Sequence, residues 1–323
     1  MTIDLKMIRD LEPGDEAVCF FVLRKKEMKT KYGSNELYVS LEFGDASGRV
    51  RGSVWQDVQS VYKGLEVGDI VKVQFKVAEF SGRLHLQVDK IRKSEDGDNI
   101  DVSKLVPVVK KDRQKLLAHL DELIELVGNS FLKGLLHRVF DDETIRKSFY
   151  DAPAGKLWHH AYLGGLLEHT LSVTDISDRI GQMYPNVNRD LLLAGGLLHD
   201  IGKITSYSYK SLIDYTDEGR LIGHIVQGAQ LVEDRIKSIE DFPDELRMQL
   251  LHLILSHQGK LEQASPVVPM TLEALILYYA DEFDSKANAF LRIRDQQKEP
   301  GAKWSSYVKL IDRYLYFGGP EES

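Results

Sequence analysis

The hydrophobic pattern of this 323-residue chain changes its period near residue 95, and that change limits the folds open to it. Before this point, segments such as 70–77 (IVKVQFKV) alternate apolar and polar residues, as half-buried strands do. From residue 110 onward, apolar residues recur at helical intervals, for example at Leu116, Leu120 and Leu123. The length exceeds what one compact domain usually needs. We therefore predict an all-β domain followed by an all-α domain.

The N-terminal segments predict a small closed barrel. About five of them fit into residues 1–95, and a short helical stretch (56–64) follows the third. Residues 79–83 (EFSGR) are typical of a hairpin turn that uses Gly82. This order resembles an OB-fold. We expect the OB-fold over residues 1–95, a linker over 96–109 and the helical domain over 110–317.

Composition narrows the class of protein. The 43% hydrophobic and 28% charged residues are typical of a globular chain, and no run approaches the roughly 18 apolar residues of a membrane-spanning helix. The charged N-terminus lacks the apolar core of a signal peptide, and Cys19 is the single cysteine. We expect a cytoplasmic protein without a membrane partner. The net charge of −8 argues mildly against nonspecific coating of nucleic acid, and the acidic surplus lies after residue 95.

The outward faces of two predicted strands carry aromatic and basic residues. The alternation places Tyr38 on the polar face of one strand, and Arg49, Arg51 and Trp55 together on the next. The preceding segment 24–33, expected to be a loop, adds cations that include Lys25, Lys26, Lys29 and Lys31. Aromatic rings that stack on bases and cations that meet phosphates suit single-stranded nucleic acid. In the alternative, Trp55 packs under the helix and the loop is merely solvated.

The helical half contains a series of histidines and aspartates at the ends of apolar stretches. Buried imidazoles and carboxylates need partners or a metal ion. Separations of tens of residues match ligands supplied by successive helices, and the lack of thiolate favours Mn²⁺, Mg²⁺ or Fe. Two carboxylates and four imidazoles suffice for two ions. The series is His169, His199, Asp200, His224, His257 and Asp281.

The pattern "LEH … HDIGK … GH … SH … AD" resembles the HD-domain metal phosphohydrolases over roughly residues 150–290. With the OB-like module in front, the whole chain is similar to the YhaM-type 3′→5′ exoribonuclease family. The resemblance implies that His169, His199, Asp200 and Asp281 hold one metal ion. His224 and His257 would complete a second site with Asp200 bridging, or would contact the phosphate.

The family resemblance also implies the reaction. It implies metal-dependent cleavage, usually with Mn²⁺, that releases nucleoside 5′-monophosphates from the 3′ end of single-stranded RNA. Single-stranded DNA and a homo-oligomer are compatible with the sequence. Two other functions stay open: a nucleotide or cyclic-dinucleotide phosphohydrolase, and an RNA-binding adaptor without activity. The first is disfavoured because "ITSYSYK" follows the His-Asp motif in place of a Gly-Tyr-Pro element.

Two aspartates, Asp281 and Asp284, are candidates for the last metal ligand. Asp281 and Asp284 share a helix face, and Asp281 is preferred because it follows "YYA" as in the family pattern. Asp284 would then orient a neighbouring ligand. His252 lies five residues before His257, so the two point apart on a helix, and His257 is the one chosen.

Asp200, Lys203 and His160 are the predicted catalytic residues. Lys203 would offset charge on the phosphoryl oxygens, or would be a lysine favourably placed at a helix C-terminus. His160 would contact the phosphate or protonate the leaving group, provided the helix of His169 begins after it. Gly165 would either open the site to substrate or allow close helix packing. The aromatic and basic residues of 303–319 show helical spacing and would pack on the core, contact substrate or join subunits.

Overall fold

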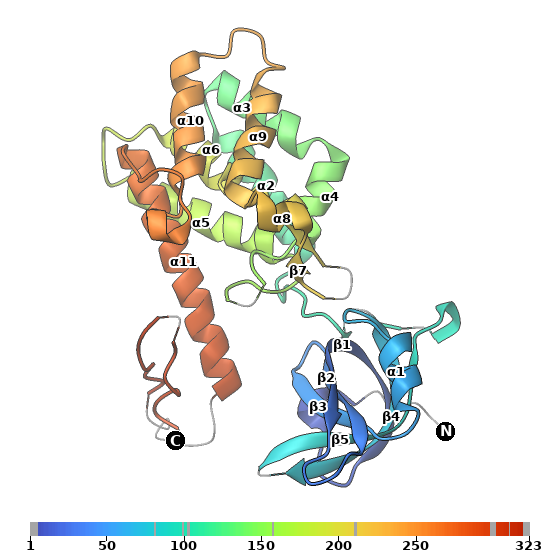
Figure 1. Cartoon of the computed structure of the whole chain (residues 1–323). Helices are drawn as coiled ribbons and strands as arrows, with labels where there is room; N and C mark the ends of the chain where they lie inside the picture. The colour runs from blue at the N-terminus through green and yellow to red at the C-terminus, as the bar shows by residue number, and fades with distance from the viewer. Residues whose placement is uncertain are drawn as a thin grey trace. The chain divides into compact units, whose positions relative to one another are not determined.

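The computed structural model describes residues 6–80, 82–98, 100–101, 104–156, 158–209, 212–297, 302–309 and 311–318. The chain divides into two compact units: Met1–Val108 with Ser208–Ile213, and Val109–Tyr207 with Asp214–Ser323. We call them the barrel unit and the helical unit (Figure 1). The expected boundaries at residues 95 and 110 stay predictions. Within the expected linker, Lys104 accepts a hydrogen bond from the Ala46 N–H (2.8 Å) and Leu105 is buried, so this part packs on the barrel unit.

The barrel unit is a closed five-stranded barrel in the order β1-β2-β3-β5-β4, so the predicted OB-like fold is confirmed. All neighbouring strands are antiparallel except β3 and β5, which are parallel. Helix α1 (Val58–Gly64) connects β3 to β4, as expected. The strands are β1 (Glu16–Thr30), β2 (Leu37–Gly44), β3 (Arg49–Val54), β4 (Ile70–Phe80) and β5 (Arg83–Lys93).

The inward residues of the alternating strands fill the barrel. Phe21, Phe43 and Phe75 are fully buried, and the ring centroids of Phe43 and Phe75 each lie 5.7 Å from that of Phe21. Burial of one such side chain stabilises the fold by about 1.5–3 kcal/mol. A Cβ at Gly52 would lie 2.8 Å from Phe43, which explains the glycine inside a strand. At the β4–β5 turn, Gly82 has φ +73°, while Ser81 lies outside the described residues.

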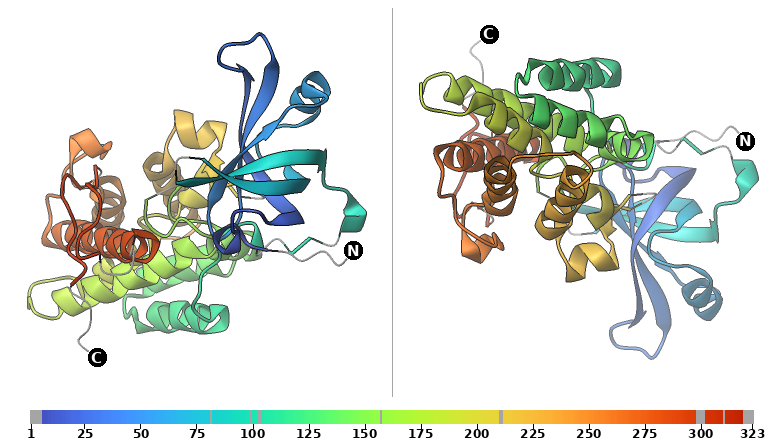
Figure 2. Two further views of the ribbon diagram at one scale, coloured as in Figure 1. Left: turned by 90° about the horizontal axis from the view of Figure 1, so that it is seen from below. Right: turned by 90° about the horizontal axis from the view of Figure 1, so that it is seen from above.

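Strand β1 is longer than the sequence pattern predicts. Residues Lys25 to Thr30 pair with β2 in register from Glu42 to Leu37, so the predicted basic loop over 24–33 is wrong for 24–30. Residues 31–33 lie in the turn between the two strands. The β1–β2 hairpin projects from the barrel as a two-stranded arm (Figure 2). Met28 is the one apolar residue between Lys25 and Thr30, so this segment lacks the apolar alternation by which strands are found.

The part of the helical unit that the structure describes is mainly α-helical and includes Tyr207 of β6 (Tyr207–Ser208) and all of β7 (Asp214–Tyr215), which pair as a two-stranded sheet. Polar side chains cap several helices: Asp112, Asn129 and Asp142 accept N–H groups of the first turn. The helices are α2 (Arg113–Leu126), α3 (Ser130–Phe140), α4 (Glu143–Asp151), α5 (Gly165–Gly181), α6 (Arg189–Leu198), α7 (Lys203–Ser206), α8 (Asp217–Leu221), α9 (His224–Ile236), α10 (Asp244–Ser256) and α11 (Leu272–Gln297).

Helix α5 packs against α6 and α11, and α10 packs against α6, α9 and α11. The buried faces of these helices therefore meet in the interior of the unit. None of the helices in the described part of the chain is long and apolar enough to cross a membrane.

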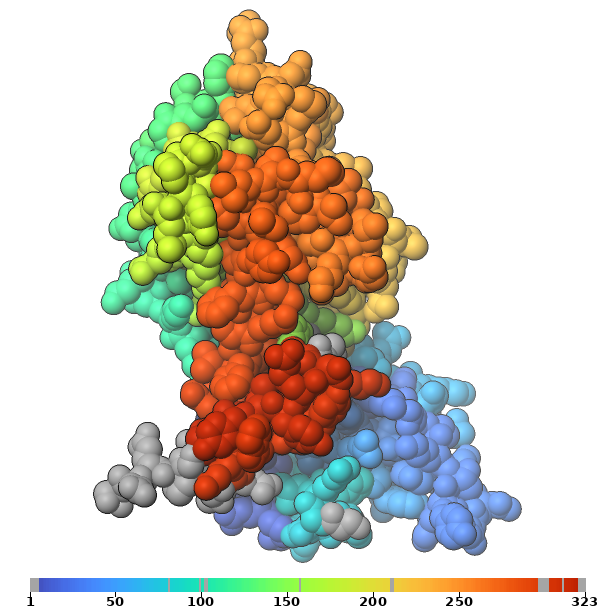
Figure 3. Space-filling view, turned by 90° about the vertical axis from the view of Figure 1, so that its left-hand side faces the viewer, coloured from blue at the N-terminus to red at the C-terminus, as the bar shows by residue number. Residues whose placement is uncertain are grey.

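The C-terminal segment (302–309 and 311–318) does not form the helix that its spacing suggests. It folds back on itself through antiparallel bridges that pair Trp304 with Tyr316 and Val308 with Arg313. Val308 and Leu315 are buried against Ile293 of α11, in agreement with the expected core packing. Figure 3 shows this segment as a compact body lying along α11.

Candidate metal centre

The structure brings all six predicted metal ligands together in the interior of the helical unit. Five segments supply them, as the sequence separations suggested. His224 retains 24% side-chain exposure, and the other five are buried. The residues are His169 in α5, His199 and Asp200 directly after α6, His224 at the start of α9, His257 directly after α10, and Asp281 in α11.

Asp200 lies at the centre of the cluster, with one oxygen toward each of two pairs of histidines. Its Oδ2 is 3.4 Å from Nε2 of both His169 and His199. Its Oδ1 is 3.4 Å from Nε2 of His224 and 3.5 Å from Nε2 of His257. Each oxygen and its two imidazoles are close enough to hold one metal ion. The carboxylate can therefore bridge two ions.

Backbone carbonyls set the tautomers of two of these histidines. Nδ1 of His199 lies 2.8 Å from the carbonyl of Gly196, and Nδ1 of His257 lies 2.7 Å from that of Ile254. Since a carbonyl only accepts, Nδ1 carries the proton in both rings. Both Nε2 atoms therefore present a lone pair to the cluster, as a metal ligand must.

Several atoms facing the centre are buried and have no hydrogen-bond partner among the described residues. They are Nε2 of His169, His199 and His224, and Oδ1 of Asp200. An unpartnered buried polar atom costs about 1–3 kcal/mol. A divalent cation would satisfy all of these atoms at once. The donor set of imidazole and carboxylate therefore fits such an ion.

Asp281 and Asp284 occupy different layers of the site. Oδ1 of Asp281 lies 3.2 Å from Nε2 of His169, on the side of the cluster. Asp284 lies behind that ring, where its Oδ2 accepts the Nδ1–H of His169 at 2.7 Å and its Oδ1 accepts the hydroxyl of Ser172 at 2.6 Å. The geometry matches the expected choice of Asp281 as ligand and Asp284 as its supporting carboxylate.

His160 lies outside the cluster, although it was expected to contact the phosphate. Its Nε2 is 2.8 Å from Oδ2 of Asp284, and its Nδ1 is 2.8 Å from the hydroxyl of Tyr162, which donates to Glu168 at 2.6 Å. Both nitrogens of this buried ring are thus engaged. Helix α5 begins at Gly165, after His160, as the sequence analysis required.

Lys203 belongs to the cluster. It is buried, and its Nζ lies 2.5 Å from Oδ2 of Asp200. It lies in α7, a single turn of four residues, and its role stays a prediction. Lys203 places a fixed positive charge beside the carboxylate that both groups of histidines share.

The pKa values reflect this concentration of charge. Burial raises the pKa of Asp200, but Lys203 and the neighbouring histidines hold it well below the ordinary value. Burial lowers the pKa of His169, and three surrounding carboxylates outweigh that effect and raise it well above its usual range. Burial lowers the pKa of His224 to about 3. Asp200 is therefore ionised and His224 neutral near pH 7, as metal ligands are, whereas His169 has to lose a proton when it binds an ion.

Close backbone contacts explain two glycines. A Cβ at Gly202 would lie 2.0 Å from the carbonyl of His224, so this glycine lets the His-Asp turn approach α9. A Cβ at Gly165 would lie 2.1 Å from the carbonyl of His160. Of the two roles considered for Gly165, close packing is therefore the one that the geometry supports.

The sequence analysis missed His159. Both of its ring nitrogens are buried without a hydrogen-bond partner among the described residues, and its ring centroid lies 5.0 Å from that of His169. The available signal was the adjacent pair "HH" before the helix of His169, of which only the second was singled out.

On the barrel, Tyr38 and Trp55 form a stacked pair with ring centroids 4.6 Å apart. Trp55 remains 40% exposed, so it does not pack under α1. Lys31 lies over its ring, 5.5 Å from the centroid. The two aromatic residues therefore form one platform with a cation at its edge.

The other predicted basic residues differ in their availability. Lys26 donates to the carbonyls of Tyr62 and Leu65, so its ammonium group is held at the end of α1. Lys25 and Lys29 both pair with Glu27, at 2.6 and 3.0 Å. Lys26 therefore differs from Lys25 and Lys29 in its contacts, a difference that follows from their positions in strand β1.

Arg49 and Arg51 line a groove on the barrel. Both are exposed, and Arg49 pairs with Glu42 at 3.3 Å. Phe80, Arg83 and His85 lie in the same groove. His85 is half-buried, and its Nε2 lies 2.6 Å from the hydroxyl of Ser53.

Comparison with known proteins agrees with this architecture. Residues 166–286 match the HD domain family, a range that includes His169, Asp200 and Asp281. The chain is 32% identical over 318 residues to the 3′-5′ exoribonuclease YhaM of Listeria welshimeri, covering 96% of this chain and 98% of that one.

Two solved structures are similar to part of the chain. The second OB-fold domain of replication protein A from Methanococcus maripaludis is 20% identical with a TM-score of 0.24, covering 30% of this chain and 98% of that one. Schizosaccharomyces pombe Pot1pC bound to single-stranded DNA is 11% identical with a TM-score of 0.24, covering 30% and 90%. Because the match to the Listeria relative covers nearly the full length of both chains, this chain belongs to the YhaM 3′-5′ exoribonuclease family, with the HD domain in its helical unit.

Proposed function

We propose that this protein is a metal-dependent 3′→5′ exoribonuclease that releases nucleoside 5′-monophosphates from single-stranded RNA. The main support for the proposal is the position of the Asp200 carboxylate, whose two oxygens each face a separate pair of imidazoles. Membership of the exoribonuclease family supports the substrate and the direction. The single cysteine, Cys19, supports a cytoplasmic location.

His169, His199, Asp200 and Asp281 would hold one ion and His224, His257 and Asp200 a second, with Mn²⁺ as the preferred metal. When bound, such ions activate water and neutralise charge on a phosphodiester. The chain's own contribution is to hold the ligands ready. The carbonyls of Gly196 and Ile254 keep two Nε2 atoms unprotonated, and Asp284 orients the ring of His169.

We assign Lys203 to charge balance at the site. Its ammonium donates to Oδ2 of Asp200, so the carboxylate stays ionised and fixed in place. In this position Lys203 also offsets negative charge brought in by a phosphate. We assign His160 to a supporting role, because its Nε2 lies 2.8 Å from the same oxygen of Asp284 that holds His169.

The barrel unit would hold the single strand. Tyr38 and Trp55 provide the stacking platform, and Lys31, Arg49 and Arg51 provide positive charge. Lys25 and Lys29 would contribute once phosphates compete with Glu27, whereas Lys26 is committed to α1. Because the two units share one chain, binding by the barrel raises the concentration of RNA at the helical unit.

The test is degradation of a single-stranded RNA in Mn²⁺ by the full-length chain and by Asp200→Asn. A 3′-labelled RNA is expected to yield labelled 5′-mononucleotide at once, while a 5′-labelled RNA shortens progressively. The variant is expected to lose activity at least 100-fold, because one charge serves both groups of ligands. Asp295→Asn, an exposed carboxylate on α11, is the matched control.

Intact RNA in every lane would contradict the proposal. If the same samples hydrolyse free nucleotides or a cyclic dinucleotide, the protein is a nucleotide phosphohydrolase. If neither is hydrolysed and RNA is bound, it is an adaptor. A DNA oligonucleotide of the same sequence measures the preference for RNA over single-stranded DNA, and sedimentation reports whether the protein is a homo-oligomer.

A further inference from the structure

A pocket of about 590 Å³ adjoins the cluster of the helical unit, with Asp281 in its wall. This volume lies within the roughly 300–1,000 Å³ of small-molecule sites in proteins. The wall consists of the loop before α5, the segment after α10, helix α11 and the C-terminal segment. Asp281 is the one predicted metal ligand among the described lining residues, so the pocket extends away from the cluster on the α11 side.

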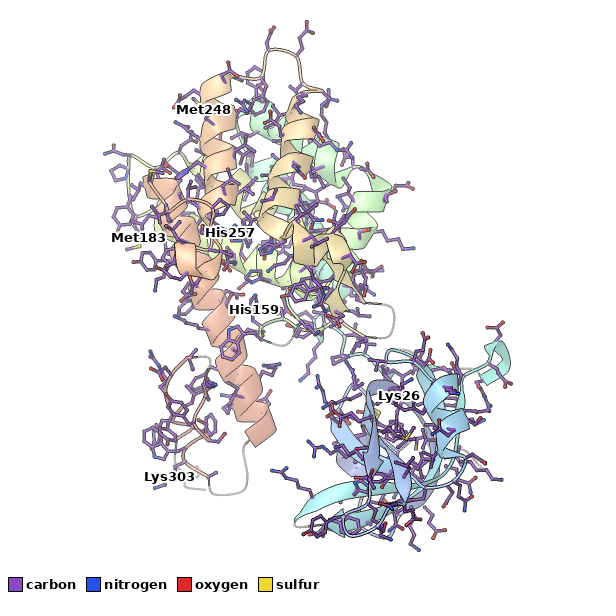
Figure 4. The ribbon with its side chains drawn as sticks, viewed as in Figure 1. Lys26, His159, Met183, Met248, His257 and Lys303 are labelled. Carbon is purple, nitrogen blue, oxygen red and sulfur yellow. The ribbon has the colours of Figure 1, made fainter. Side chains whose placement is uncertain are left out.

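His159 lies at the junction of pocket and cluster. It lines the pocket, and its ring is 5.0 Å from the ring of His169. In Figure 4 its side chain lies beside the ribbon of α11. Among the histidines that the structure describes, His159 alone has both ring nitrogens buried and unpartnered. Because an unmet buried imidazole is unfavourable, the geometry calls for a polar group of a ligand here.

The rest of the pocket wall combines apolar surface with three cations and three carboxylates. Of these, Lys286 pairs with Glu282, and Asp312 accepts the hydroxyl of Tyr307. Trp158 and Phe290 line it, and both pack on the small core around Val308 and Leu315. Lys260 and Arg313 also line it, and neither has a carboxylate within ion-pair distance among the described residues. The wall therefore combines aromatic rings with two cations that have no ion-pair partner among the described residues.

The C-terminal segment forms a fixed side of the pocket. Its bridges and its buried residues Val308 and Leu315 hold it against Ile293, and Ile311 and Arg313 face the pocket. The C-terminal segment thus forms one wall of the pocket beside the cluster.

We propose that this pocket binds the 3′-terminal nucleotide of the RNA, with His159 donating a hydrogen bond to the scissile phosphate and Trp158 contacting the terminal base. The inference rests on the proposed function. A 3′→5′ exonuclease must hold its cleaved phosphate at the metal cluster and accommodate one nucleotide beyond it. The pocket provides that space, and its aromatic residues suit a base regardless of sequence.

The first experiment measures binding of adenosine 5′-monophosphate to the full-length Mn²⁺-loaded protein by calorimetry. His159→Gln is expected to weaken this binding at least 10-fold, to leave the affinity for Mn²⁺ within twofold, and to leave adenosine binding unchanged, because adenosine has no phosphate. His137→Gln, an exposed histidine paired with Glu125 and Asp141, is the control. Wild-type affinity for the monophosphate in His159→Gln would overturn the assignment, as would an equal loss of Mn²⁺ affinity.

The second experiment tests the base contact. RNA with an abasic 3′-terminal residue is expected to raise the KM of the wild type several-fold and to leave the KM of Trp158→Ala unchanged, since that variant has already lost the contact. Tyr314→Ala, in the same C-terminal segment but 60% exposed and outside the pocket, is the control. An equal response of wild type and Trp158→Ala to the abasic end would refute the base contact.

These results separate the inference from the function on which it rests. If wild-type protein degrades RNA from the 3′ end and both variants behave as wild type, the pocket assignment fails alone. If wild-type protein does not degrade RNA, the proposed function fails, and binding of the monophosphate still reports on the pocket.

Discussion

Oδ2 of Asp284 lies 2.7 Å from Nδ1 of His169, on the side of the ring opposite the metal cluster. The same oxygen lies 2.8 Å from Nε2 of His160. Asp284 thus fixes the tautomer and the orientation of a predicted metal ligand without facing the centre itself. Carboxylates in this position tune metal affinity through the imidazole that they hold.

Replacing Asp284 should therefore weaken metal binding without abolishing it. Asp284→Asn is expected to lower the affinity for Mn²⁺ by about 10–100-fold, the usual effect of removing such a supporting group. Calorimetric titration of the metal-free protein measures this change, with Asp295→Asn on the exposed side of α11 as control. Complete loss of binding would instead make Asp284 a direct ligand.

The pair of Lys203 and Asp200 should contribute most to stability when no metal is bound. Lys203→Met leaves a buried carboxylate without its cation and is expected to cost about 3–5 kcal/mol in the free energy of unfolding of the metal-free protein. Mn²⁺ should recover part of this loss, because it supplies positive charge at the same carboxylate.

Lys237→Met is the matched control for that experiment. Lys237 and Asp234 have the same spacing of three residues as Lys203 and Asp200, but their side chains are 64% and 73% exposed. An exposed pair contributes about 0–1 kcal/mol, so this variant should unfold like the wild type. Denaturant unfolding with and without Mn²⁺ provides the comparison, and equal effects of the two substitutions would contradict the role of Lys203.

Gly202 should be intolerant of any side chain. In Gly202→Ala, the new Cβ would lie 2.0 Å from the carbonyl of His224 and 2.5 Å from the amide nitrogen of Gly228, so α9 must move away. We expect a lower melting temperature and weaker Mn²⁺ binding. Gly134→Ala in α3, where nothing lies within 4 Å of the new Cβ, should be neutral or stabilise the protein by up to about 1 kcal/mol. Thermal melts that rank the two variants equally would be inconsistent with this packing.

Trp55 should matter for long RNA and not for the chemistry. Trp55→Ala is expected to weaken binding of single-stranded RNA by about 1–3 kcal/mol, the typical contribution of one stacked base. Trp55→Phe keeps a ring against Tyr38 and should retain most of the affinity. Fluorescence anisotropy measures binding, and hydrolysis of a small model phosphodiester should stay at the wild-type rate in both variants. Equal losses on both substrates would argue against a division of labour between the units.

The sequence predicted the larger features because they follow from local patterns. A period of two in segment 70–77 and helical spacing around Leu120 depend only on near neighbours in the chain, so the change from barrel to helices was readable. The arm of β1 escaped prediction because Met28 is its one apolar residue between Lys25 and Thr30, so no apolar period marks it.

For the site, the sequence determined the chemical types of the ligands, and the tertiary structure decided their arrangement. The identities of His169 and Asp281 fix an imidazole and a carboxylate as ligands, whatever their positions in space. Which oxygen of Asp200 faces which histidine depends on how α5, α9, α10 and α11 pack around the His-Asp turn. Tertiary structure likewise decided that Lys203 contacts Asp200 in the cluster, that His160 contacts Asp284 outside it, and that the ring of His159 has no partner. These surroundings depend on helix packing, which local sequence patterns do not reveal.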